Sequence, residues 1–222
     1  MVFTFKGFKG KIENSFKKLV DLTKKIKNDR KKLFSLLTDL QKILEKQKFI
    51  RPYCNNNQYR VILDNYTIVE ICKVSGIINA MSELVYRVRV KIANETGLLD
   101  KILHIYNEEM HRALQQNDKA TIKELEEIKL KIAKELRATE IQQEEEIIKR
   151  IINLHNEKEK LVENLIVRIR NDAIKKDFNY LHKLIKNEKK LINALDKFMK
   201  KDEKTLRNEI NLINKTEHII QY

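Results

Sequence analysis

The 222-residue sequence has little glycine or proline, only two cysteines and no tryptophan. Tight turns and phosphate-cradling loops depend on glycine and proline. From Leu98 to Tyr222 the chain has neither residue. This absence excludes a P-loop or a dinucleotide-binding glycine motif from the second half of the chain. The composition therefore argues against an α/β nucleotide-binding enzyme.

Cysteine and long apolar runs are also scarce. Cys54 and Cys72 have no neighbouring C-x-x-C or Cys/His cluster, so we interpret them as reduced thiols without a cofactor. No apolar run approaches the roughly 18 residues of a membrane-spanning helix, and the N-terminus lacks the apolar core of a signal peptide. We therefore expect a soluble, cytoplasmic protein.

Apolar residues recur with a heptad spacing in the first quarter of the chain. One column is purely Ile or Leu, at Ile12, Leu19, Ile26, Leu33 and Leu40. Such a seam lets one helix pack along another. The companion column is interrupted by Thr23 and Arg30. Pro52 and the asparagines that follow it favour turns, so we place a turn near 49–58.

The middle of the chain has a broad apolar face at helical spacing, which is typical of a central helix in a bundle. Val88, Val90 and Ile92 also alternate as a strand would, but they have no partner strand, so we predict helix there. Further turns are expected near 115–119 and 171–172.

The last segment repeats an apolar residue every seven positions, at Phe178, Ile185, Ile192, Met199, Leu206, Ile213 and Ile220. Glu188, Asp202 and Glu209 interrupt its companion column. We predict an all-α, elongated antiparallel helical bundle or coiled coil of four to five long helices. It would comprise a leader at 1–11 and one domain at 12–222. We also predict a homodimer, in which a second chain would pack against the apolar column from Phe178 to Ile220. Light scattering that shows a monomer would contradict this prediction.

Positive charge is concentrated at the N-terminus. The whole chain has a net charge of +14, and residues 1–51 contain 15 basic against 5 acidic side chains. The lysines lie off the apolar seam, so we expect a basic outer face that contacts an anionic partner. The residues assigned to this contact are Lys6, Lys9, Lys11, Lys17, Lys18, Lys24, Lys25, Lys31 and Lys32.

Three functional interpretations of this region stay open. The lysines could neutralise a nucleic-acid backbone or another anionic polymer, or contact a partner helix. Alternatively, Phe3, Phe5 and Phe8 could insert into an anionic membrane surface, which would make the chain a peripheral membrane protein. A purely structural interpretation has the phenylalanines cap one end of the bundle and the lysines form a solvated face.

One set of residues resembles a metal site. His104, Glu108 and His111 fall within about 60° of one another on a helix, and imidazole and carboxylate ligands suit zinc or iron. The triplet projects away from the neighbouring apolar stripe, so we expect it to face solvent. No spacing supports a catalytic nucleophile. We therefore predict a non-enzymatic binding or assembly protein without a small-molecule substrate, with metal binding as a further alternative.

Overall fold

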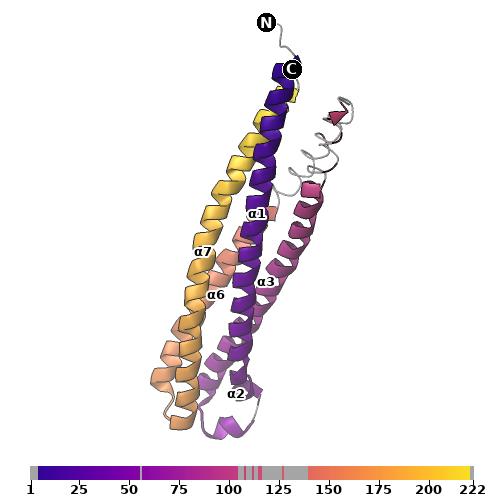
Figure 1. The fold of residues 1–222 in the computed structure, drawn as a ribbon. Helices are drawn as coiled ribbons and strands as arrows, with labels where there is room; N and C mark the ends of the chain where they lie inside the picture. Colours follow the sequence, from indigo (N-terminus) through magenta and orange to yellow (C-terminus); the bar gives the residue numbers. More distant parts are fainter. Residues whose placement is uncertain are drawn as a thin grey trace. The chain divides into compact units, whose positions relative to one another are not determined.

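A computed structural model describes residues 5–55, 57–104, 108, 112, 115–116, 127 and 140–220. Four long helices make up most of this part: α1 (Phe5–Gln47), α3 (Asn65–His104), α6 (Glu140–Arg168) and α7 (Asp172–Ile220) (Figure 1). The described residues contain no strand. The predicted all-α helical bundle is therefore confirmed. Val88, Val90 and Ile92 lie within α3, so their strand-like alternation has no structural counterpart.

The segment between α1 and α3 is built from short helical turns. The helix α1 ends at Gln47 and is followed by η1 (Lys48–Ile50), α2 (Pro52–Asn55) and η2 (Asn57–Val61). Pro52 is the first residue of α2. The N–H group of a first helical residue has no partner within the helix, so the lack of this group in proline costs no hydrogen bond. The turn expected near 49–58 is therefore where α1 ends, whereas the turn expected at 115–119 lies outside the described residues except at Gln115 and Gln116.

Side-chain caps start the helices α3 and α7. Asp64 caps α3, because its carboxylate accepts hydrogen bonds from the backbone N–H of Thr67 at 2.8 Å and from the Thr67 hydroxyl at 2.7 Å. These bonds lower the pKa of Asp64. Asn171 caps α7, since its Oδ1 accepts from the backbone N–H of Ile174 at 3.1 Å. From there α7 continues unbroken for 49 residues.

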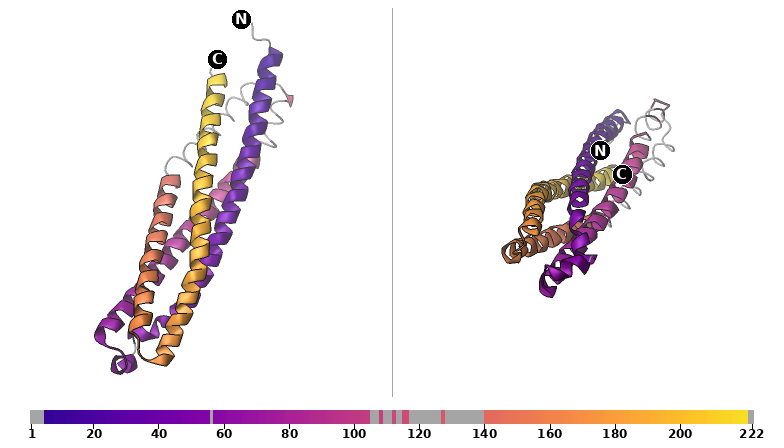
Figure 2. Two further views of the ribbon diagram at one scale, coloured as in Figure 1. Left: turned by 90° about the vertical axis from the view of Figure 1, so that its left-hand side faces the viewer. Right: turned by 90° about the horizontal axis from the view of Figure 1, so that it is seen from below.

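Two compact units divide the chain. The first contains 1–32, 92–143 and 199–222, and the second contains 33–91 and 144–198. Within the second unit the four helices run alongside one another in alternating directions, and α2 lies at the end where α1 gives way to α3 (Figures 1 and 2). Helical apolar periodicity explains this arrangement, because each helix turns its buried apolar residues toward its neighbours.

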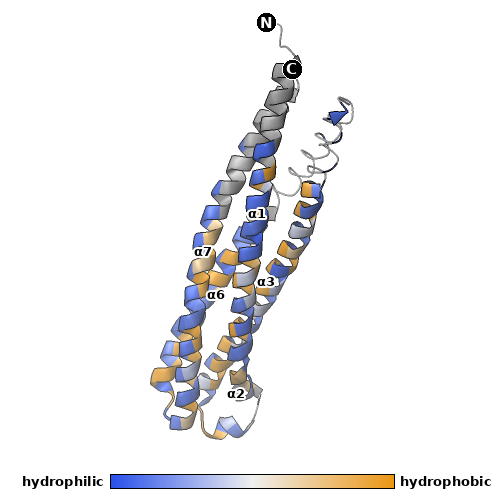
Figure 3. Cartoon of the chain, in the orientation of Figure 1, coloured by the Kyte–Doolittle hydropathy of each residue, from blue (hydrophilic) through white to orange (hydrophobic). Residues whose placement is uncertain are grey.

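The core of the second unit lies near α2. Tyr53 packs against Tyr59 and Phe178, with ring centroids 4.5 Å and 5.9 Å away, and its hydroxyl donates to Asp177. Figure 3 shows hydrophobic and hydrophilic residues interspersed along the coloured parts of the four helices. The buried cluster consists of Ile50, Tyr53, Leu63, Ile68, Ile71, Val74, Ile78, Val162, Leu165, Ile169, Ile174, Phe178, Leu181 and Ile185.

The first unit combines apolar packing with ion pairs between α1 and α3. Ile26 and Leu99 are buried against each other, with Leu22 packed beside them. Arg30, which interrupts the apolar column of α1, is itself buried, and its Nε lies 3.3 Å from Glu95 Oε2. The interruption therefore marks a buried ion pair.

The seven-residue apolar column of α7, from Phe178 to Ile220, is buried by other parts of the same chain wherever its side chains are described. Phe178, Ile185, Ile192 and Met199 are all buried. Leu206 and the later seam positions lie outside the described side chains. The homodimer stays a prediction.

Candidate functional site

Six of the assigned lysines form a double row on α1. We call Lys17, Lys18, Lys24, Lys25, Lys31 and Lys32 the lysine ladder, and all six side chains are exposed. Its adjacent pairs repeat every seven residues, or about 10.5 Å along the helix axis. The ladder lies off the buried column of Thr23, Ile26 and Arg30, so the packing of α1 holds it toward solvent. Lys6, Lys9 and Lys11 belong to α1, but their side chains lie outside the description.

Two acids lie within the same stretch of α1. Asp21 is exposed among the lysines. Asp29 is buried, and its Oδ1 lies 3.9 Å from the Nζ of Lys32. The ladder therefore contributes six exposed positive charges against one exposed negative charge between residues 17 and 32.

The phenylalanine leader is continuous with this helix from Phe5 onward. Phe5 and Phe8 lie in α1, whereas Phe3 precedes the described residues, and none of the three side chains is described. Among the described residues, no helix combines the length and the apolar character needed to cross a membrane. The insertion of these phenylalanines into a membrane surface stays a prediction.

The predicted metal triplet is described in part. His104 and Glu108 are exposed, as expected, and Glu108 Oε2 lies 3.7 Å from Arg112 Nη2. His111 lies outside the described residues.

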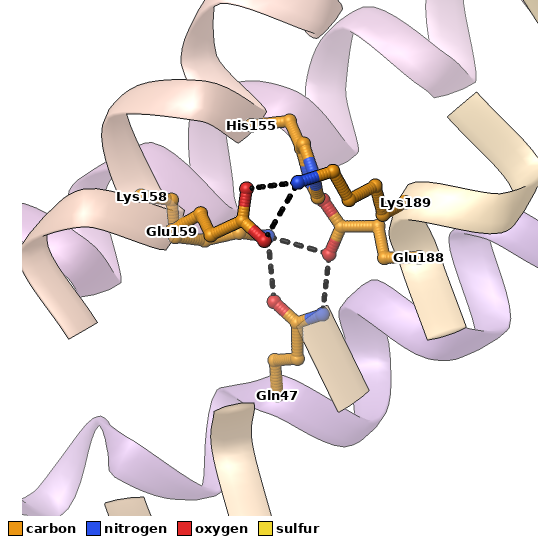
Figure 4. Close-up of polar contacts among 6 residues, drawn as sticks. All are labelled: Gln47, His155, Lys158, Glu159, Glu188 and Lys189. Carbon is orange, nitrogen blue, oxygen red and sulfur yellow. Dashed lines mark hydrogen bonds and ion pairs between the residues drawn. The ribbon is translucent and has the colours of Figure 1, made fainter. Parts of the chain in front are cut away.

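A buried polar network joins α1, α6 and α7 inside the second unit (Figure 4). It consists of Gln47, His155, Lys158 and Glu188, each no more than 1% exposed. Glu188 accepts hydrogen bonds from Gln47, from Lys158 Nζ at 2.6 Å and from His155 Nδ1 at 2.7 Å. Lys158 Nζ also donates to Gln47 Oε1 at 2.7 Å. The carboxylate of Glu188 on α7 is thus the acceptor that links this helix to α1 and α6.

Burial and charge act against each other in this network. Burial lowers the pKa of Lys158, although the negative charge of Glu188 opposes the shift. Burial alone would raise the pKa of Glu188, but the hydrogen bond from His155 and the charge of Lys158 hold it below its ordinary value. Three donors around one carboxylate support this direction. Because all four side chains are sealed from solvent, we interpret the network as structural.

Less deeply buried polar residues continue outward from this network. Lys189 on α7 donates to both carboxylate oxygens of Glu159 on α6, at 3.1 Å and 2.8 Å (Figure 4). One turn further along α6, Glu163 Oε1 lies 3.6 Å from His182 Nε2 of α7. These groups therefore form a second polar contact between the two helices, nearer to solvent.

Sequence reasoning missed the buried network, although one signal was present. Glu188 stands between Leu181 and Leu195 in the companion column of α7, a position that faces the core. An acid at such a position indicates a buried partner as readily as a gap in the seam. The four-residue spacing of His155 and Glu159 is typical of an exposed helical pair, but His155 is buried.

Comparison with known proteins adds no assignment to this geometry. The chain matches no known protein family, and neither the curated proteins nor the solved structures include a significant match.

Proposed function

We propose that the chain is a non-enzymatic binding protein whose lysine ladder docks onto an anionic polymer, with a nucleic-acid backbone as the preferred partner. The observation that carries this proposal is the regular double row of six exposed lysines on one helix. Lysines at this density release condensed counterions when they neutralise backbone phosphates, and this release favours binding without reading sequence.

Contact with a polymer suits the described part of α1 better than insertion into a membrane. An inserted helix must offer an apolar face to the lipid. In α1, Ile26 and Leu33 are already buried within the protein, and the side facing solvent is charged. The membrane-surface alternative therefore rests on the phenylalanine leader, and the test below includes it.

The test compares two variants that lose the same charge in different places. The first replaces the six ladder lysines by glutamine. The second replaces six exposed lysines of α7 by glutamine, namely Lys176, Lys183, Lys186, Lys190, Lys197 and Lys204. Each change lowers the net charge from +14 to +8. Binding of duplex DNA and co-sedimentation with anionic liposomes are measured across a salt series.

We expect the wild-type chain to bind DNA with a steep dependence on salt. Each phosphate contact adds about 0.9 to the slope of log affinity against log salt. Loss of the ladder should therefore flatten that slope by as much as about 5 units, while the α7 variant should stay within about 1 unit of the wild type. Equal losses in the two variants, or no DNA binding by the wild type, would contradict the proposal. Salt-resistant liposome binding that needs Phe3, Phe5 and Phe8 would favour the membrane alternative.

A further inference from the structure

A mixed cluster of carboxylates and an imidazole lies on the outer side of the α6–α7 contact. Glu159 and Glu163 are one turn apart on α6, and His182 approaches from α7. One ligand atom from each residue lies within 4.8 Å of the ligand atoms of the other two. The side chains of Glu159, Glu163 and His182 are 15%, 55% and 21% exposed. The cluster is thus half enclosed, with its opening at Glu163.

The imidazole in this cluster has an unused nitrogen. The Nε2 atom of His182 is buried and makes no hydrogen bond within the part of the chain that the structure describes. Its distance of 3.6 Å from Glu163 Oε1 is too long for a hydrogen bond. Two ligands bound at about 2.0–2.2 Å to one tetrahedral metal ion are separated by roughly 3.3–3.6 Å. The separation therefore fits a cation shared by the two groups.

The geometry points to a binding site for a divalent transition-metal ion of the zinc or manganese class at Glu159, Glu163 and His182. One imidazole nitrogen with two carboxylates suits these ions, whereas Ca²⁺ and Mg²⁺ take oxygen ligands. Three protein ligands leave at least one coordination position open, and it lies toward solvent at Glu163. The bound ion would join α6 to α7 beside the buried network.

Lys189 competes with the ion for one ligand. It donates to both oxygens of Glu159, so it must release that carboxylate when the metal binds. The side chain of Lys189 is 49% exposed, and an ion pair of this kind is weak, so its release costs little. Removal of the ammonium group should therefore tighten metal binding, whereas removal of a ligand should weaken it.

The test is a titration of the full chain with Mn²⁺ and with Zn²⁺ by isothermal calorimetry. Mn²⁺ is included because it avoids thiolate ligands, which separates this site from Cys54 and Cys72. We expect one Mn²⁺ per chain. Glu163→Gln and His182→Ala should each weaken binding more than about tenfold, and Lys189→Met should tighten it about two- to fivefold. Circular dichroism checks that each variant keeps its helical content.

The matched control replaces an exposed glutamate outside the cluster, with Glu83→Gln on α3. The side chain of Glu83 is 61% exposed, and we expect the Mn²⁺ affinity of this variant to stay at the wild-type value. The inference would be overturned by the absence of a 1:1 complex, or by Glu163→Gln and His182→Ala variants that bind as the wild type does. Weaker binding by Lys189→Met would exclude Glu159 from the ligand set and would also overturn the three-residue site.

Discussion

Glu188 accepts hydrogen bonds from three buried side chains, and its loss would leave one of them charged and unpaired. Lys158 is fully buried and relies on Glu188 for its counter-charge. We expect Glu188→Leu to lower the free energy of unfolding by about 3–5 kcal/mol, because an uncompensated ammonium then stays in the core. Urea-induced unfolding, followed by circular dichroism, measures the change.

The control replaces the whole network at once, with Gln47→Leu, His155→Phe, Lys158→Met and Glu188→Leu combined. Removal of every buried polar partner together leaves no charge unpaired, and such concerted replacements are often neutral or stabilising. We expect this concerted variant to be at least as stable as Glu188→Leu, and closer to the wild type. A concerted variant that is less stable than Glu188→Leu would show that the network adds more than charge compensation.

The lowered pKa of Glu188 also predicts how stability responds to acid. The folded-state pKa lies below the ordinary value of 4.5, so the unfolded chain binds the proton more readily. The stabilising contribution of Glu188 is complete above pH 4.5 and is lost as the pH falls through the folded-state pKa. We therefore expect the wild type to lose more unfolding free energy than the concerted variant between pH 5 and pH 3. Asp64, whose pKa is also lowered, is present in both proteins and cancels in the comparison.

At the scale of single residues, the sequence showed where the pattern breaks but did not show the reason. Arg30 and Glu188 both stood out because they occupy apolar columns. Their partners, Glu95 and Lys158, come from other helices, and heptad counting within one helix carries no information on which distant residue lies opposite. In the sequence, the buried charges therefore looked like interruptions of the apolar columns.

At the scale of helices, α3 offers a direct test of propensity. Gly76 is exposed in its interior, and a Cβ atom built there meets nothing within 4 Å. We expect Gly76→Ala to raise the free energy of unfolding by about 0.5–1 kcal/mol, because alanine loses less backbone entropy in a helix. Thermal or urea unfolding measures the change. Ala80→Gly, one turn later, should act in the opposite direction, and a Gly76→Ala variant without added stability would contradict this account.

The apolar periodicity of the helices and the positions of their ends were the features best predicted from the sequence. The seven-residue repeat in α7 predicted an apolar seam, and its positions from Phe178 to Met199 are buried. Pro52 and Asn171 marked the connections that precede α3 and α7, because turn and capping residues act locally. The short helices between α1 and α3 were not predicted, since segments of three to five residues carry too little periodicity to be recognised.

At the scale of the whole molecule, the location of the charge matters more than its total. The ladder holds six of the 46 basic residues, but it presents them in register on one helix. A further column of exposed lysines lies on α7 at the same seven-residue interval, from Lys176 to Lys204. The anionic contact is assigned to α1 because the balance of basic over acidic residues is most positive there. The comparison of the two six-lysine variants, one in α1 and one in α7, decides whether the local excess of positive charge on α1 or the total charge of the chain governs binding.

The division into two units has a consequence for how such a protein can change over evolution. Their boundaries at Lys32, Ile92, Gln143 and Met199 fall inside α1, α3, α6 and α7, not in connections between helices. A genetic crossover at any of these points would join one part of a helix to a foreign part, and the positions of the apolar residues would have to match across the joint. The two units are therefore expected to be inherited together, and shuffling of exons or gene fragments would not readily exchange one for another.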